Sequence, residues 1–130
     1  MKKYGFIILL LALVKLGSAQ YSLTFCENIT SDGKPIKASN SFMVGHNGSL
    51  LKVLLKADGK LNSENMDFRV FIINDSGKEE ELSRLPQKVE TTWNYAWKEM
   101  VFFDAGTYRI KVYNSKGSYL TSANLNVKQQ

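Results

Sequence analysis

Cysteine, histidine and proline are scarce in this sequence, and each scarcity excludes a class of protein. The single cysteine, Cys26, excludes an internal disulfide, so the fold must depend on its apolar core. The single histidine, His46, excludes a zinc site built from several histidines and cysteines. The two prolines, Pro35 and Pro86, lie in polar surroundings, and no repeat or low-complexity tract divides the chain. We therefore expect one uninterrupted domain.

Long apolar runs are also rare, and the only one lies near the N-terminus, from Phe6 to Val14. It follows two lysines and precedes the small residues Gly17, Ser18 and Ala19, which is the pattern of a secretory signal peptide. The run is well short of the roughly 20 residues that cross a bilayer, so we expect no stable membrane anchor. The sequence thus predicts a signal peptide over residues 1–19, cleavage near Ala19 and a secreted or periplasmic domain over residues 20–130.

A strong excess of one charge sign is absent once that leader is removed. Residues 1–19 contain three of the 17 lysines and arginines and none of the 12 acids, which leaves 14 bases against 12 acids. The bases are spread singly with acids between them, whereas a protein that neutralises several phosphates needs them clustered. We therefore expect no nucleic-acid partner.

Short runs of alternating apolar and polar residues make up the rest of the chain, and turn residues separate them. Such spacing is typical of an antiparallel sandwich or barrel. We expect strands over 21–26, 42–44, 50–56, 66–73, 93–103, 107–113 and 119–128. The Asn47-Gly48 dipeptide predicts a hairpin between the second and third of these. Residues 78–88 are charged and contain Pro86, which indicates a long loop or a weak edge strand.

The segment from Phe103 to Tyr113 contains Asp104, Gly106 and Tyr108 in front of an alternating strand. It resembles the penultimate strand of immunoglobulin-like sandwiches, including the bacterial and polycystic-kidney-disease-type modules. The resemblance implies an all-β, immunoglobulin-like antiparallel β-sandwich of about seven strands. It also implies that the Tyr108 hydroxyl bonds to upstream backbone and forms a structural corner. The paired cysteines of antibody domains are missing, so a bacterial-type variant is expected.

Candidate catalytic residues are few. A nucleophilic enzyme would need His46 near Cys26, but no third group that orients a base is evident, and Cys26 follows alternating apolar residues. We expect Cys26 to be a buried apolar residue, the alternative being a free thiol that links two chains as a homodimer. Four polar residues between two strands, Asp58, Asn62, Glu64 and Asp67, are expected to be ordinary turn residues rather than a calcium site. We expect no metal, no cofactor and no enzymatic activity.

Three aromatic residues, Trp93, Tyr95 and Trp97, are the most informative constellation, because alternation on a strand would place them on one face. They either fill the core between the sheets or form an exposed platform for sugars or a protein. We expect the core, because aromatic area is usually buried; Tyr113 and Tyr119 would then be the better surface candidates.

The function expected from the sequence is a non-enzymatic binding or structural module that contacts another macromolecule. The alternative is a carbohydrate-binding module that uses Trp93, Tyr95 and Trp97. The partner is thus a protein or a polysaccharide.

Overall fold

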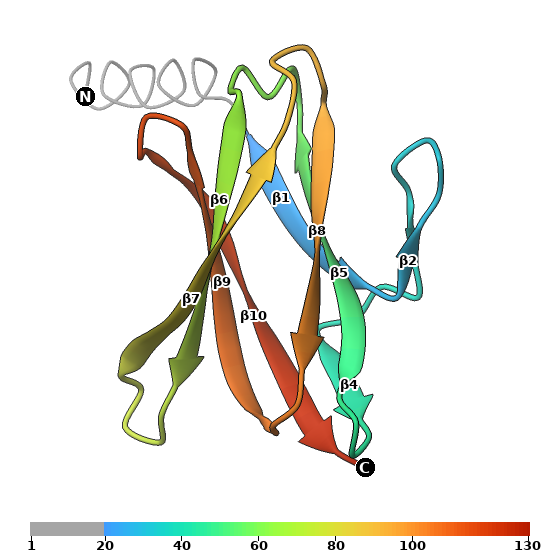
Figure 1. Ribbon diagram of the computed structural model, residues 1–130, viewed down its shortest axis with the longest axis vertical. Helices are drawn as coiled ribbons and strands as arrows, with labels where there is room; N and C mark the ends of the chain where they lie inside the picture. The colour runs from blue at the N-terminus through green and yellow to red at the C-terminus, as the bar shows by residue number, and fades with distance from the viewer. Residues whose placement is uncertain (1–19) are drawn as a thin grey trace, which may run out of the picture.

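Ten strands and no helix make up residues 20–130, the part of the chain that this computed structural model describes (Figure 1). The predicted signal peptide and its cleavage near Ala19 lie outside the described residues. Within them, no helix has the length and apolarity to span a membrane. The strands are β1 (Tyr21–Cys26), β2 (Asn28–Ile29), β3 (Pro35–Ile36), β4 (Ser41–Val44), β5 (Ser49–Ala57), β6 (Asn65–Ile73), β7 (Glu79–Lys88), β8 (Tyr95–Phe102), β9 (Gly106–Asn114) and β10 (Tyr119–Gln129).

Two sheets face each other and enclose the core. One has the order β1-β5-β8 and the other the order β4-β10-β9-β6-β7, while β2 and β3 pair only with each other. Every pairing is antiparallel except that of β4 with β10. With strands lettered in chain order, these sheets correspond to A-B-E and to G-F-C-C′ of immunoglobulin sandwiches, with β4 added beside G.

Alternation along the strands places one set of side chains in the core. On β6 the inward residues Met66, Phe68 and Val70 are buried, and Ile110 and Val112 lie beside them on β9. Leu51, Val53 and Leu55 of β5 face them from the other sheet and are equally buried. The strands expected over 50–56, 66–73 and 107–113 are therefore confirmed, and a period of two residues assigns each of their side chains to one face of a sheet.

The turn between β8 and β9 is held by Tyr108. Its hydroxyl donates a hydrogen bond to the carbonyl oxygen of Asp104, 2.8 Å away, and its ring packs edge-on against Phe102 with centroids 5.0 Å apart. This is the contact of a tyrosine corner, in which a buried phenol fixes the crossover from one sheet to the other.

The hairpin predicted at Asn47-Gly48 is wrong. The turn itself forms, since Gly48 has a φ of 81° and its N–H donates to the carbonyl oxygen of Gly45 at 3.1 Å. However, β4 pairs in parallel with β10 in the five-stranded sheet, whereas β5 lies between β1 and β8 in the other. Both edges of β5 are thus occupied, and the turn carries the chain from one sheet to the other.

The charged segment 78–88 contains the ten-residue edge strand β7, so the edge-strand alternative is confirmed and the loop alternative is wrong. Its three glutamates and Pro86 suit an edge, where a missing N–H costs no sheet hydrogen bond and charge discourages further pairing. Together with the two-residue strands β2 and β3, it raises the number of strands from the predicted seven to ten.

Candidate functional site

The predicted aromatic residues lie on the outer surface rather than in the core. Trp93 precedes β8 and is 47% exposed, while Trp97 on β8 is 40% exposed. The expectation that they fill the inter-sheet space is therefore wrong. The register of β8 turns Ala96, Met100 and Phe102 inward instead. Successive side chains of a strand point to opposite faces of the sheet, so only one of the two rows can be buried against the facing sheet.

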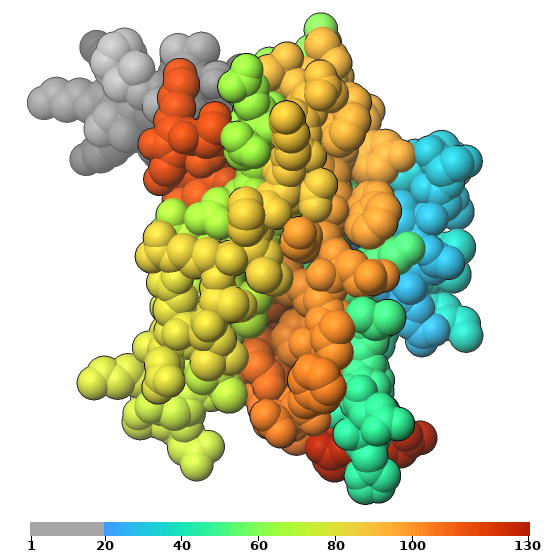
Figure 2. Space-filling model, viewed as in Figure 1, coloured from blue at the N-terminus to red at the C-terminus, as the bar shows by residue number. Residues whose placement is uncertain are grey.

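An exposed apolar strip follows the outer face of β8. Its members are Trp93, Trp97, Val101 and Phe103, together with Leu50 of β5, which lies directly opposite Val101. Phe103 is 58% exposed and is the most exposed of them. One carboxylate, that of Glu99, interrupts the strip between Trp97 and Val101. Figure 2 shows β8 in orange along this side of the molecule, next to β7 in yellow.

Tyr95, the third predicted residue, has a structural contact. Its hydroxyl donates to the carbonyl oxygen of Ser31 at 3.0 Å, and a Cβ added to Gly33 would lie only 2.8 Å from the ring. Both partners belong to the β2–β3 hairpin, which lies beside the three-stranded sheet (Figure 1). Tyr95 thus holds this hairpin against the outer face of the sheet.

The β2–β3 hairpin contacts Cys26, one of two buried residues outside the main core. Cys26 and Leu54 are completely buried although they belong to the outward rows of β1 and β5, and neither is part of the inter-sheet cluster. The buried location predicted for Cys26 is confirmed. Burial raises the pKa of its thiol, against smaller opposing effects of a backbone hydrogen bond at Ile36 and the charge of Lys52. The thiol is therefore neither exposed nor activated.

A small hollow lies between the two tryptophans at the start of β8. It has a volume of about 370 Å³, and the residues that line it also include Tyr95, Gln87 and Asn94. The ammonium group of Lys52 lies 4.6 Å from the centroid of the Trp97 ring. Flat rings beside amide groups form a surface that can stack on an apolar face and hydrogen-bond hydroxyl groups. We call this the aromatic hollow.

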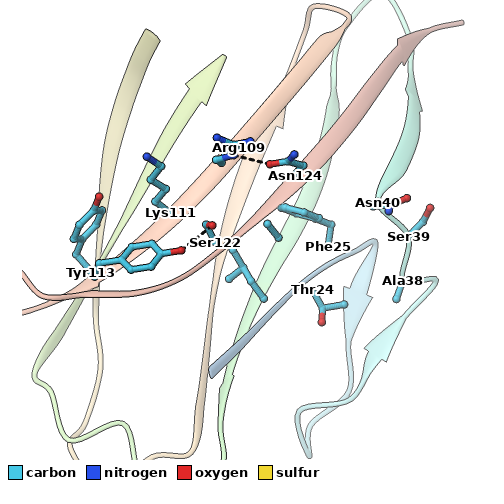
Figure 3. A pocket seen from close by; sticks show the side chains of 13 residues that line it. Thr24, Phe25, Ala38, Ser39, Asn40, Arg109, Lys111, Tyr113, Ser122 and Asn124 are labelled. Atoms are coloured by element: carbon cyan, nitrogen blue, oxygen red, sulfur yellow. Dashed lines mark hydrogen bonds between the residues drawn. The ribbon is translucent and has the colours of Figure 1, made fainter. Parts of the chain in front are cut away.

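A larger groove of about 1090 Å³ lies at the opposite open edge of the sandwich, between β1 and β10 (Figure 3). Tyr113 and Tyr119, named above as alternative surface candidates, both line it, with ring centroids 5.8 Å apart. Its positive groups, Arg109 and Lys111, are already paired with the same carboxylate, that of Glu79. The two positive groups of this polar groove therefore share one carboxylate, and nothing in its sequence pattern had indicated a cavity.

The Glu79 pairing should make stability depend on pH. Hydrogen bonds from Lys111 and then Arg109 lower the pKa of Glu79. A carboxyl group whose pKa is lower in the folded state stabilises the fold above its unfolded pKa of about 4.3, and this contribution disappears as pH falls through the folded value. We expect Glu79→Gln to destabilise the protein at pH 7 and to have a progressively smaller effect as the pH falls below about 4.3. Urea unfolding of both proteins from pH 7 to pH 3 measures this; an effect independent of pH would contradict it.

The remaining candidates do not form a site. His46 is exposed in the turn before β5, whereas the Cys26 thiol is buried and donates to the carbonyl oxygen of Lys52. Asp67 forms an ion pair with Arg69 at 2.8 Å, while Asp58 and Glu64 are exposed. Among the described residues, no group of three or more acids, histidines or cysteines is placed to hold a metal ion.

Comparison with known proteins gives information on the fold only. Neither known protein families nor curated proteins give a match to this sequence. Among solved structures, an immunoglobulin-like protein from Pseudomonas aeruginosa is 14% identical, covering 86% of this chain and 93% of its own, with a TM-score of 0.49. The CARDB domain of a Pyrococcus furiosus protein is 11% identical, covering 87% and 94%, with a TM-score of 0.44. The strand order, the two facing sheets and the tyrosine corner establish the chain as an immunoglobulin-like β-sandwich.

Proposed function

We propose that this immunoglobulin-like domain is a non-enzymatic binding module that contacts another macromolecule through the apolar strip. The exposure of two tryptophans, Val101 and Phe103 on one sheet face is the observation that carries the proposal. Exposed apolar side chains that lie together on a soluble domain usually mark a contact surface, and tryptophan is enriched among the residues that dominate binding energy. The outer face of β8 is therefore the surface on which a partner would gain the most binding free energy.

The same proposal places the protein outside the cytoplasm, as a secreted or periplasmic module, on the leader pattern of residues 1–19. A non-enzymatic role fits the described chemistry. The only thiol has a raised pKa under the β2–β3 hairpin, and the only histidine lies in an exposed turn. Nucleophilic catalysis needs a thiolate or an activated hydroxyl within reach of a base.

A second candidate, carbohydrate binding, is favoured by the aromatic hollow. Trp93 and Trp97 line a space of about 370 Å³ together with Gln87 and Asn94. Aromatic rings can stack on the apolar faces of sugar rings while amides bind their hydroxyl groups. Because Tyr95 is engaged with Ser31 and Gly33, the platform consists of two rings rather than the three that the sequence suggested.

Substitution of the two tryptophans tests both candidates. We expect Trp93→Ser with Trp97→Ser to weaken retention of the protein on envelope fractions of the producing cell by about 30-fold, the effect of losing one dominant contact residue. Met43→Ser is the matched control, because Met43 is 56% exposed but lies on β4 in the other sheet. Equal retention of the double variant and the wild type would show that the strip is not the contact surface.

Tryptophan fluorescence then separates protein partners from glycans. The protein has two tryptophans, both exposed, so acrylamide should quench most of its emission. Protection from quenching by a soluble polysaccharide would favour the carbohydrate candidate. Protection by the protein fraction of the envelope alone would favour a protein partner for the apolar strip.

A further inference from the structure

One long edge of the three-stranded sheet is unpaired. β8 lies at the end of the order β1-β5-β8 and pairs only with β5. The N–H of Ala57 donates to the carbonyl oxygen of Asn94 at 2.9 Å, so the backbone groups of even-numbered residues point toward β5. The N–H and C=O groups of successive residues point to opposite sides of a strand. The N–H and C=O groups of Trp97, Glu99 and Val101 therefore point to the open edge.

The opposing edge strand, β7, differs in chemistry. It carries three consecutive glutamates, Arg84, Pro86 and Lys88 along its length. Charged residues and proline on an edge strand discourage pairing with a further strand. The open edge of β8 instead carries the apolar strip on its outer side, and only Lys98 and Glu99 are charged there. Of these two edges, β8 is the one suited to accept a strand.

Space for side chains exists on the inner side of this edge. A hollow of about 370 Å³ lies between β7 and β8, with Leu82 and Leu85 on one wall and Met100 and Phe102 on the other. In an A-B-E-D sheet of an immunoglobulin sandwich, a fourth strand occupies the position beside β8. The side chain of Lys98 crosses the opening at one point, where its ammonium group donates to the carbonyl oxygen of Pro86 at 3.2 Å.

We propose that the open edge of β8 binds an extended peptide segment in which a lysine or arginine lies between two apolar residues, each two positions away. This inference rests on the proposed function and names the partner as a polypeptide that adds a fourth, antiparallel strand. The basic residue would lie on the open side of Glu99. Lys52 lies opposite Glu99 on β5, but its ammonium group contacts Asn28 and the Trp97 ring and forms no ion pair with this carboxylate among the described residues. The apolar residues would cover Trp97 and Val101.

The inner side of the edge restricts the partner further. Because Lys98 passes beneath the open edge to reach β7, the residue opposite Lys98, which follows the basic one, must be small. Larger side chains there would meet the Lys98 stem or displace it from Pro86. The recognised pattern is therefore an apolar residue, a residue that faces the hollow beside Met100, a basic residue, a small residue and a second apolar residue.

A second copy of this chain fits the edge poorly. The two antiparallel registers that pair most of β8 with its symmetry mate place either Lys98 opposite Lys98 or Glu99 opposite Glu99. Like charges directly opposite each other destabilise a strand pair. A foreign strand that places a basic residue opposite Glu99 replaces the repulsion between like charges with attraction between opposite charges.

The test uses the nine-residue peptide Thr-Ala-Val-Ala-Lys-Ala-Val-Ala-Thr and hydrogen exchange of the protein. In the free protein, amides of Trp97, Glu99 and Val101 should exchange quickly, because they have no partner, and those of Ala96 and Lys98 slowly. Saturating peptide should slow the three odd-numbered amides by at least about tenfold. Slow exchange of these amides in the free monomer would overturn the proposal, as would a dimer in sedimentation that protects them.

Peptide and protein variants test the backbone pairing and the charge. N-methylation of the lysine and both valines should abolish binding, because the backbone N–H groups of these three residues point toward β8. N-methylation of the flanking alanines should not, because their N–H groups point away from β8. Glutamate in place of the lysine should weaken binding about tenfold, and Glu99→Lys should reverse that preference. Equal affinity for both N-methylated peptides, or for both charges, would overturn the proposal.

Val101 offers a matched pair of variants. Val101→Pro removes an N–H that points away from β5, so it should reduce peptide binding about tenfold without breaking the β5–β8 pairing, whereas Val101→Thr should bind normally. If the peptide does not bind but the tryptophan variants still lose retention, the edge proposal fails and the proposed function stands. If the peptide binds but the tryptophan variants keep full retention, the strip fails as the main contact surface.

Discussion

Replacement of Phe68 with alanine is expected to lower the free energy of unfolding by about 3–5 kcal/mol. Phe68 lies on β6 and is completely buried between the two sheets, with Val112 and Leu85 opposite it on the neighbouring strands. The loss combines the transfer of the ring to water with the cavity left in a closely packed core. Domains of this size are stable by about 5–15 kcal/mol, so the variant should be near the limit of folding.

Phe71→Ala is the control for this prediction. Phe71 belongs to the same strand but to its outer face, where the Lys111 ammonium group lies 4.6 Å from the ring centroid. Phe71→Ala should lower the free energy of unfolding by no more than about 1 kcal/mol, which is the contribution of a partly exposed packing and cation–π contact. Urea unfolding of both variants measures the difference. Equal losses would show that the assigned faces of β6 are wrong.

Gly33→Ala should open the β2–β3 hairpin and expose the Cys26 thiol. Gly33 has a φ of 83°, where an L-residue costs about 1–2 kcal/mol, and the added methyl would lie 2.8 Å from two ring carbons of Tyr95. The ring cannot move freely because its hydroxyl is bonded to Ser31. We expect the thiol to react with a disulfide reagent at least about tenfold faster, as the open state becomes more populated.

Gly77→Ala provides the matched control. Gly77 has a φ of 86°, almost the same as that of Gly33, but a Cβ there meets nothing within 4 Å. It lies in the turn between β6 and β7, so the substitution carries the same backbone strain without contact with Tyr95. Thiol reactivity should stay at the wild-type rate. A similar increase in both variants would mean that general destabilisation, and not hairpin opening, exposes Cys26.

Local alternation made most of the fold predictable from the sequence. The inward rows of β5 and β9 follow from a period of two residues, which needs no knowledge of the partner strand. The destination of β4 could not be predicted in this way. Its pairing with β10 joins residues such as Ser41 and Asn126, which are distant in the chain, and the turn at Gly48 is compatible with either sheet.

The candidate site was predictable in part. The sequence grouped Trp93, Tyr95 and Trp97, but a shift of one residue in register decides whether such a row faces the core or the solvent. The inward row turned out to be Ala96, Lys98, Met100 and Phe102, in which three of the four side chains are apolar. The role of Tyr95 depended on Gly33, and this contact across the sheet leaves no local pattern in the sequence.

The parallel pairing of β4 with β10 has a consequence for the order in which the domain is completed. Ribosomes add about 5–20 residues per second, so β4 emerges several seconds before the strand that pairs with it. During that interval Val44, which is fully buried in the finished sandwich, has no sheet to join. Contacts between distant segments also slow folding in general. The apolar side chain of Val44 therefore stays unburied until β10 has been synthesised.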